Sequence, residues 1–149
     1  MMRILIDADG CPVVDEAIRI AQLNKTACII LCDTSHEFSR DGAKTVTVSK
    51  GADSVDFKIV NMLSADDIVI TQDYGLAAMC LARRAAVISQ NGMIYDEYNI
   101  DALLLQRHTA KKIRMAGGHL SGNPKRTKAQ DDKFSDALAS LIKKRSALE

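Results

Sequence analysis

Short apolar runs alternate along the chain with longer segments of helical period, and this alternation constrains the fold more than any other feature. The run at residues 27–32 lacks the polar alternation of a half-exposed strand, as expected of a strand that is covered on both faces, and the run at 68–71 is interpreted as another buried strand. Strands of that kind, separated by helices, form parallel sheets with right-handed crossovers. The pattern therefore predicts the α/β class, as a three-layer α/β/α sandwich around a mostly parallel sheet of about five strands.

The expected elements follow from the same periodicities. Strands are predicted at residues 2–6, 27–32, 45–48, 68–71 and 86–89, with a brief extended piece at 93–95. Helices are predicted at residues 13–23, 53–63, 75–84, 99–115 and 129–146.

Composition restricts the class of protein further. The chain has 149 residues, of which 47% are hydrophobic and 26% charged, which fits a single globular domain over residues 1–149 and excludes disorder. No window has the ~7–15 apolar residues of a signal peptide or the ~20 of a membrane helix, so we expect a cytoplasmic protein without a membrane partner. The four cysteines lack CxxC spacing and are expected to be buried, reduced thiols.

Charge is divided unevenly along the chain. Residues 1–101 hold nine Lys and Arg against fifteen Asp and Glu, whereas residues 102–130 hold seven Lys and Arg and no acid. An acidic body with one basic segment suggests a site for cations beside a surface for anions. A solvated basic helix is the alternative interpretation of that segment.

Aspartates follow the predicted strands at their carboxyl ends, where α/β proteins carry their sites. Asp7 and Asp9 follow the first strand and Asp73 follows the fourth, while Asp53 and Asp56 open the helix before the fourth strand. If the first and fourth strands are neighbours, these carboxylates converge. Like charges in such a cluster repel one another and normally await a cation. Because the donors are all oxygen, Mg²⁺ or Mn²⁺ is the expected cofactor, and both metals support phosphodiester hydrolysis.

Several of these acids also have a structural interpretation. Asp53 and Asp56 could stabilise a helix N-terminus, and Asp73 could cap the helix after it. Asp131 could complete the cluster as a distant further ligand, or it could lie at the start of the last helix. We interpret Asp33 as a loop acid. The pair Asp66-Asp67, at the opposite edge of the sheet, is interpreted as a solvated turn.

The basic segment could hold a phosphate backbone without reading bases. RNA or single-stranded nucleic acid is then the expected partner. The candidate phosphate contacts are Arg107, Lys111, Lys112, Arg114, Lys125, Arg126 and Lys128.

Four motifs occur together in a fixed order: DADGCPV at residues 7–13, GADSVD at 51–56, ITQDYGLA at 70–77, and PKRT at 124–127 with DDKF at 131–134. Together they resemble the YaiI/YqxD family of uncharacterised bacterial proteins over essentially the whole chain. The resemblance implies a PIN-like nuclease fold, in which acidic residues bind divalent metal and cleave RNA or DNA.

Residue by residue, the resemblance matches Asp7 and Asp9 to the first-strand acids and Asp73 to the later strand-end acid. It matches Asp53 or Asp56 to the helix acid. It also implies a last acid, and residue 123 separates a glycine and a proline that are commonly adjacent in the family, so the choice between Asp131 and Asp132 stays open.

The leading functional hypothesis is a metal-dependent nuclease with Asp7, Asp9, Asp56 and Asp73 as catalytic residues and with Asp7, Asp9, Asp53, Asp56, Asp73 and Asp131 as candidate metal ligands. A non-catalytic RNA- or protein-binding module is the alternative. A haloacid-dehalogenase-like phosphatase would use Asp7 as nucleophile and Asp9 as acid and base. Two features argue against the phosphatase: Cys11 stands where that class has Thr or Val, and a later paired-acid motif is missing.

Overall fold

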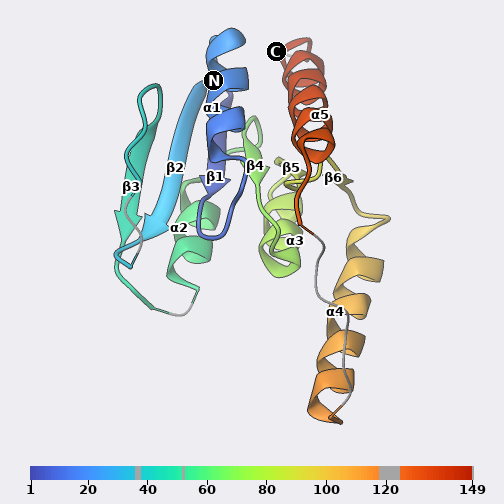
Figure 1. Cartoon of the computed structure of the whole chain (residues 1–149). Helices are drawn as coiled ribbons and strands as arrows, with labels where there is room; N and C mark the ends of the chain where they lie inside the picture. The colour runs from blue at the N-terminus through green and yellow to red at the C-terminus, as the bar shows by residue number, and fades with distance from the viewer. Residues whose placement is uncertain (36–37, 52, 118–124, 149) are drawn as a thin grey trace.

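A parallel sheet with helices on both faces forms the centre of the molecule (Figure 1). The computed structural model describes residues 1–35, 38–51, 53–117 and 125–148, and these form six strands in the order β3-β2-β1-β4-β5-β6. β6 pairs antiparallel with β5, and the other pairs are parallel. The strands are β1 (Arg3–Asp7), β2 (Ala27–Asp33), β3 (Lys44–Val48), β4 (Ile68–Ile70), β5 (Ala86–Ile88) and β6 (Ile94–Tyr95).

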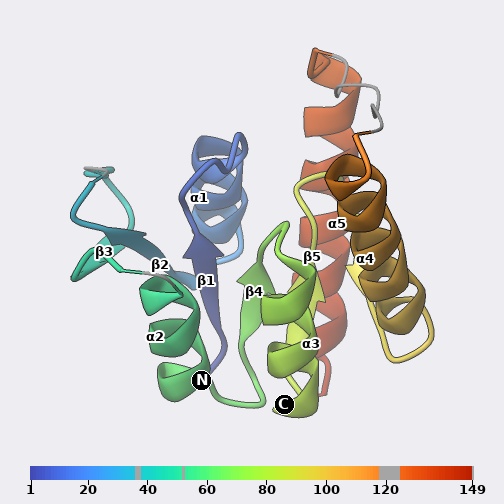
Figure 2. The same cartoon turned by 90° about the horizontal axis from the view of Figure 1, so that it is seen from below.

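The helices form the outer two layers (Figure 2). One face of the sheet packs against α1 (Val14–Leu23) and α5 (Lys128–Ser146). The other face packs against α2 (Ser54–Met62), α3 (Tyr74–Ala82) and α4 (Ile100–Met115). The predicted α/β/α sandwich is confirmed. The sheet gains a sixth strand because the short extended piece pairs with β5 through Ile88 and Ile94.

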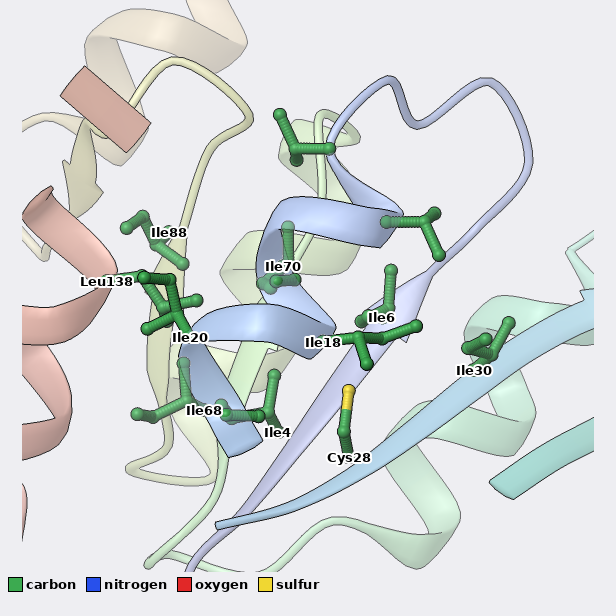
Figure 3. Packing of buried hydrophobic residues seen from close by; sticks show 14 of the residues in the cluster. Ile4, Ile6, Ile18, Ile20, Cys28, Ile30, Ile68, Ile70, Ile88 and Leu138 are labelled. Atoms are coloured by element: carbon green, nitrogen blue, oxygen red, sulfur yellow. The ribbon is translucent and has the colours of Figure 1, made fainter. Parts of the chain in front are cut away.

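The residues of the central strands β1, β2, β4 and β5 alternate between two hydrophobic cores. On the α1 and α5 side, Ile4 and Ile6 of β1 lie with Ile68 and Ile70 of β4 against the helices (Figure 3). On the other side, Leu5 of β1 packs with the cluster beneath α2, α3 and α4. Because both faces of these strands are buried, their sequences lack the alternation of polar and apolar residues seen in half-exposed strands, which explains the continuous apolar runs.

The order of the strands opens a crevice between β1 and β4. From β1 the chain passes through α1 to β2 and then β3, and it returns through α2 to β4 on the other side of β1. Neighbouring strands whose connections leave in opposite directions create the crevice at their carboxyl ends in which α/β proteins bind ligands. Ile6 lies opposite Ile70 at that end of the pair.

Local sequence fixes the start of the last helix. The Thr127 hydroxyl accepts a hydrogen bond from the Gln130 N–H, and the Gln130 side chain accepts one from the Thr127 N–H. This reciprocal capping box satisfies two backbone donors and starts α5 at residue 128, one residue before the predicted position. Of the described helices, none combines the length and the apolarity needed to cross a membrane.

The cysteines are all free thiols. Cys28, Cys32 and Cys80 are buried, as predicted, whereas Cys11 is only partly buried. Burial raises the pKa of the Cys28 thiol to about 12, so this side chain is a protonated, apolar part of the core at neutral pH.

The interpretation of Asp66-Asp67 as a solvated turn is wrong for Asp67, whose side chain is fully buried. Its carboxylate accepts bonds from the Arg3 guanidinium at 2.6 Å, from the Arg3 backbone N–H at 3.1 Å and from the Ser64 N–H at 2.9 Å. Burial is possible because these donors satisfy both carboxylate oxygens. Asp66 is exposed, so adjacent aspartates at the start of β4 have different roles.

Replacing Asp67 by Ala is expected to lower the free energy of unfolding by roughly 2–4 kcal/mol, because it leaves the Arg3 guanidinium and two backbone donors without their acceptor. The matched control is Asp66→Ala, which should change stability by no more than about 0.5 kcal/mol. Urea unfolding followed by circular dichroism measures both. Equal stability of the two variants would contradict the assignment of Asp67 as a buried anchor.

Candidate functional site

The carboxyl ends of β1 and β4 form the floor of a cavity of about 310 Å³. Asp7 is the last residue of β1, and Asp73 follows β4 and precedes α3. The adjacency of the two strands was the condition on which convergence of these carboxylates depended, and it holds. The cavity is lined by Asp7, Asp9, Gly10, Cys11, Ile70, Thr71, Gln72, Asp73 and Gln90.

Thr71 connects the two aspartates through its buried side chain. Its hydroxyl donates to Oδ2 of Asp7 at 2.7 Å and accepts a bond from the Asp73 backbone N–H at 3.0 Å. Since the hydroxyl proton is directed at Asp7, Thr71 holds this carboxylate in place. This internal role differs from the contact with phosphate or metal-bound water that a threonine near a strand end could also make.

Burial and neighbouring charge act together on Asp7. The pKa of its carboxyl is raised to about 6, mainly by burial, with further increases from the charges of Asp73 and Asp9. The hydrogen bond from Thr71 works in the opposite direction, because it stabilises the charged form. The ionised Asp7 carboxylate therefore lowers the stability of the folded protein, as expected of a group with a role beyond stability.

Asp56 adds a third carboxylate, from the first turn of α2. Its pKa is also raised to about 6, first by burial and then by the charges of Asp73, Asp7 and Asp53, while Arg107 opposes the shift. Asp53 lies just before the helix in a left-handed conformation with φ of 62°, and its side chain makes no capping bond to α2. The structure thus brings both helix acids toward the cluster, with Asp56 the more buried.

Asp73 has a structural role as well as a place in the cluster. Its Oδ1 accepts a hydrogen bond from the Leu76 N–H at 3.1 Å, so it is the N-cap of α3. The same oxygen lies 3.6 Å from Nη1 of Arg107 on α4. Arg107, predicted as a phosphate contact, is thus paired with a member of the acidic cluster.

Asp131 and Arg126 form a separate network. Nε of Arg126 donates to the Asp131 carboxylate at 2.5 Å, and the other guanidinium nitrogens donate to the Gln90 carbonyl at 2.6 Å and to Asn91 Oδ1 at 2.8 Å. Asp131 is not among the charges that shift Asp7 or Asp56. The Asp131 carboxylate is therefore paired with the Arg126 guanidinium. Through its bond to the Gln90 carbonyl, the same guanidinium also holds a residue that lines the cavity.

The remaining basic candidates lie on the surface. Lys111 and Lys112 on α4 are exposed, as are Lys125 and Lys128 before and at the start of α5. The side chain of Arg114 lies outside the described residues, as does the segment 118–124 with its departure from the family pattern. Four exposed lysines are thus available to a polyanion.

Gln72 and Gln90 are cavity residues that the sequence analysis did not single out. Gln72 follows β4 and Gln90 follows β5, and the Gln90 N–H donates to Oε1 of Gln72 at 3.1 Å. The rule that strand ends carry the site would have found both, had it been applied to amides as well as to acids.

The donor type and the negative charge of the cluster suit a hard divalent cation, because carboxylate oxygens are the ligands that Mg²⁺ and Mn²⁺ prefer. In the described part of the chain, no three His, Cys, Asp or Glu side chains are already arranged to hold a metal ion. Cys11 supplies no thiolate, because burial raises the pKa of its thiol to about 11. The fit is therefore one of charge and donor chemistry, and not of a ready-made ligand shell.

Comparison with known proteins gives consistent matches over nearly the whole chain. The family described as "Uncharacterized BCR, YaiI/YqxD family" matches residues 5–144. A UPF0178 protein of Exiguobacterium sibiricum is 49% identical over 141 residues, which cover 95% of this chain and 96% of the relative. A UPF0178 protein of Ruminiclostridium cellulolyticum is 48% identical over 145 residues, which cover 97% and 95%. No solved structure gives a significant match.

Replacing Asp7 by Asn is expected to stabilise the protein at pH 8 by about 1–3 kcal/mol, because the folded-state pKa near 6 lies above the ordinary value of 3.8. Such a carboxyl destabilises the fold above pH 6, and the penalty disappears as the pH falls toward 3.8. The gain in the Asn variant should therefore shrink between pH 7 and pH 4. Asn can still accept the Thr71 bond.

The measurement is urea unfolding of the wild type and the variant across that range, with Asp66→Asn as the exposed control. A variant that is less stable than the wild type at pH 8 would show that the Asp7 carboxylate is not under electrostatic strain.

Proposed function

The chain belongs to the YaiI/YqxD family, and from its own carboxylates we propose that it is a divalent-metal-dependent nuclease that hydrolyses phosphodiester bonds of RNA or single-stranded nucleic acid. One observation supports this most: Asp7, Asp56 and Asp73 converge at the carboxyl ends of β1 and β4, and two of them have pKa values near 6. Burial raises these values most, and repulsion between the carboxylates adds to it; a bound cation would offset both effects. The PIN-like nuclease fold implied by the sequence motifs is part of the same proposal.

Asp7 and Asp73 would hold the main metal ion, and Asp9 and Asp56 would bind it directly or through water. A bound Mg²⁺ or Mn²⁺ would neutralise phosphate charge and lower the pKa of a bound water. Asp9 lines the same cavity as Asp7 and Asp73. Asp131 is the weakest member of the predicted ligand set, because its carboxylate is paired with Arg126.

The protein groups around the cluster have separate tasks in this proposal. Thr71 keeps the Asp7 carboxylate oriented through its 2.7 Å hydrogen bond. Asp56 brings a further carboxylate to the cluster from the first turn of α2, within the influence of the charges of Asp73 and Asp7. These roles use side chains that the fold already holds, so little reorganisation accompanies catalysis.

The exposed lysines would position the substrate. α4 projects from the body on the side where the β1 arrow ends (Figure 1), and it presents Lys111 and Lys112 to solvent. Contacts from lysine to phosphate carry no sequence information but strengthen binding at low salt. Lys125 and Lys128 extend the same charge toward α5.

A non-catalytic nucleic-acid-binding module is the second candidate. The observation that favours it is the Asp73 carboxylate, which already accepts a bond from Leu76 and lies beside Arg107. A binding module would need only the basic surface, so its affinity would fall with salt and would not depend on metal.

The test is cleavage of a 5′-labelled single-stranded RNA by purified protein with Mg²⁺ or Mn²⁺, with EDTA as the control. Asp7→Asn is expected to lower the rate at least ~100-fold, because it removes a charged ligand of the metal. Asp66→Asn, an exposed acid at the other edge of the sheet, should retain the wild-type rate.

Undiminished cleavage by Asp7→Asn protein would overturn the assignment. Salt-sensitive binding without metal-dependent cleavage would instead establish the binding module. Turnover of a phosphomonoester, with phosphate trapped on Asp7, would establish the phosphatase chemistry of the haloacid-dehalogenase class.

A further inference from the structure

A second hollow, of about 370 Å³, shares Asp73 with the cavity of the acidic cluster. Its lining comes from the start of α2, from α3 and from Arg107 of α4. Two apolar side chains of this lining face solvent, since Phe57 is 58% exposed and Met79 is 37% exposed. We call this hollow the Phe57 groove.

The polar lining of the Phe57 groove is mostly acidic. Asp53, Asp56 and Asp73 supply carboxylates, and Arg107 supplies a guanidinium. A free anion is therefore a poor occupant, because three negative charges oppose one positive charge. A neutral, flat group with N–H donors suits both the apolar surface and the carboxylate acceptors.

Gly75 lies beside both Asp73 and Arg107 at this groove. A Cβ at Gly75 would stand 3.2 Å from Oδ1 of Asp73, which is tighter than nine in ten real Cβ contacts, and 3.4 Å from Nη1 of Arg107, at the limit of ordinary contact. The guanidinium therefore lies beside the first turn of α3 and next to Asp73, the residue that the groove shares with the cavity. A cation at this place can meet the phosphate that precedes or follows a base in the groove.

We propose that the Phe57 groove binds one unpaired base of a single-stranded nucleic acid whose adjacent phosphate lies at Asp7 and Asp73, an inference that rests on the proposed nuclease function. The base stacks on the Phe57 ring and contacts Met79. Its amino or ring N–H groups donate to a carboxylate at the start of α2, as amino groups of bases do to acidic side chains. Arg107 contacts the phosphate beside the base.

This arrangement selects single strands for a physical reason. Every base has a π face that can stack on an aromatic ring, whereas a base within a duplex has both faces covered by its neighbours. The Phe57 ring thus provides an aromatic platform next to the reacting phosphate, although the chain as a whole has few aromatic residues.

The test measures binding separately from cleavage. A fluorescein-labelled eight-nucleotide single-stranded RNA is titrated with wild type, Phe57→Ala and Phe57→Tyr in Ca²⁺, and the Kd is read from fluorescence anisotropy. Phe57→Ala is expected to weaken binding about 5- to 100-fold, because it removes one base-stacking contact. Phe57→Tyr keeps the ring and should stay within about threefold of wild type.

Two controls isolate the groove. Leu23→Ala removes a large exposed side chain, 69% exposed, from α1 on the opposite face of the sheet, and it should leave the Kd unchanged. A wild-type titration with the same RNA carrying an abasic nucleotide at each position in turn should show one position at which the affinity drops, and Phe57→Ala should lose that dependence.

The outcomes separate this inference from the proposed function. If wild type cleaves RNA with metal and Phe57→Ala binds RNA as well as wild type does, the groove proposal alone is overturned. If wild type neither binds nor cleaves RNA, both fail. If Phe57→Ala loses affinity for a labelled hexa-arginine peptide and not for RNA, the groove is a cation site and the base proposal is overturned.

Discussion

β1 lies between β2 and β4, and both cores and the acidic cluster depend on that placement. The parallel pairing of Ile6 with Ile70 buries both side chains beneath α1 and α5, and it sets Asp7 close to the loop that holds Asp73. The apolar pairing supplies the stability that offsets a partly buried carboxylate at the end of β1. The hydrophobic core therefore does more than hold the fold, because it keeps negative charges together that would otherwise separate.

The layers and the convergence of acids could be predicted because they follow from local and periodic features. Apolar runs without polar alternation required a sheet covered on both faces, and the two helical layers confirm it. Asp7, Asp9 and Asp73 were expected to converge with Asp53 or Asp56, because parallel strands end at one edge of a sheet. Besides burial, the charge of Asp73 raises the pKa of both Asp7 and Asp56, as expected of neighbouring carboxylates. The rule about carboxyl ends depends only on the direction of the strands, and the alternation of strands and helices along the sequence predicts that the strands are parallel.

The partners of individual charges could not be predicted in the same way. Asp67 is a polar residue in a turn by every local criterion, yet it is buried because Arg3, 64 residues away in sequence, reaches it. Arg107 is a basic residue in a basic segment, but it pairs with Asp73 of another element. Arg126 pairs with Asp131, five residues along the chain, and also reaches Gln90 and Asn91 after β5. Contacts between residues that are distant in sequence depend on tertiary geometry, which the composition of the chain does not specify. Gln72 and Gln90 were not predicted as cavity residues because the site was predicted from acidic side chains, and an amide is uncharged.

In the proposed function, the acidic cluster binds a divalent metal ion, while the adjoining Phe57 groove and the exposed lysines contact the nucleic acid. Isothermal titration calorimetry of Mn²⁺ and Mg²⁺ into the wild type and Asp7→Asn tests most directly whether the cluster binds a divalent cation. The titrations are made with and without a non-cleavable phosphorothioate oligonucleotide, because such metals often bind together with substrate phosphates. Saturable binding is expected in the wild type, and its loss is expected in Asp7→Asn. Equal binding in both proteins, or none in the wild type under either condition, would contradict cation binding by the cluster.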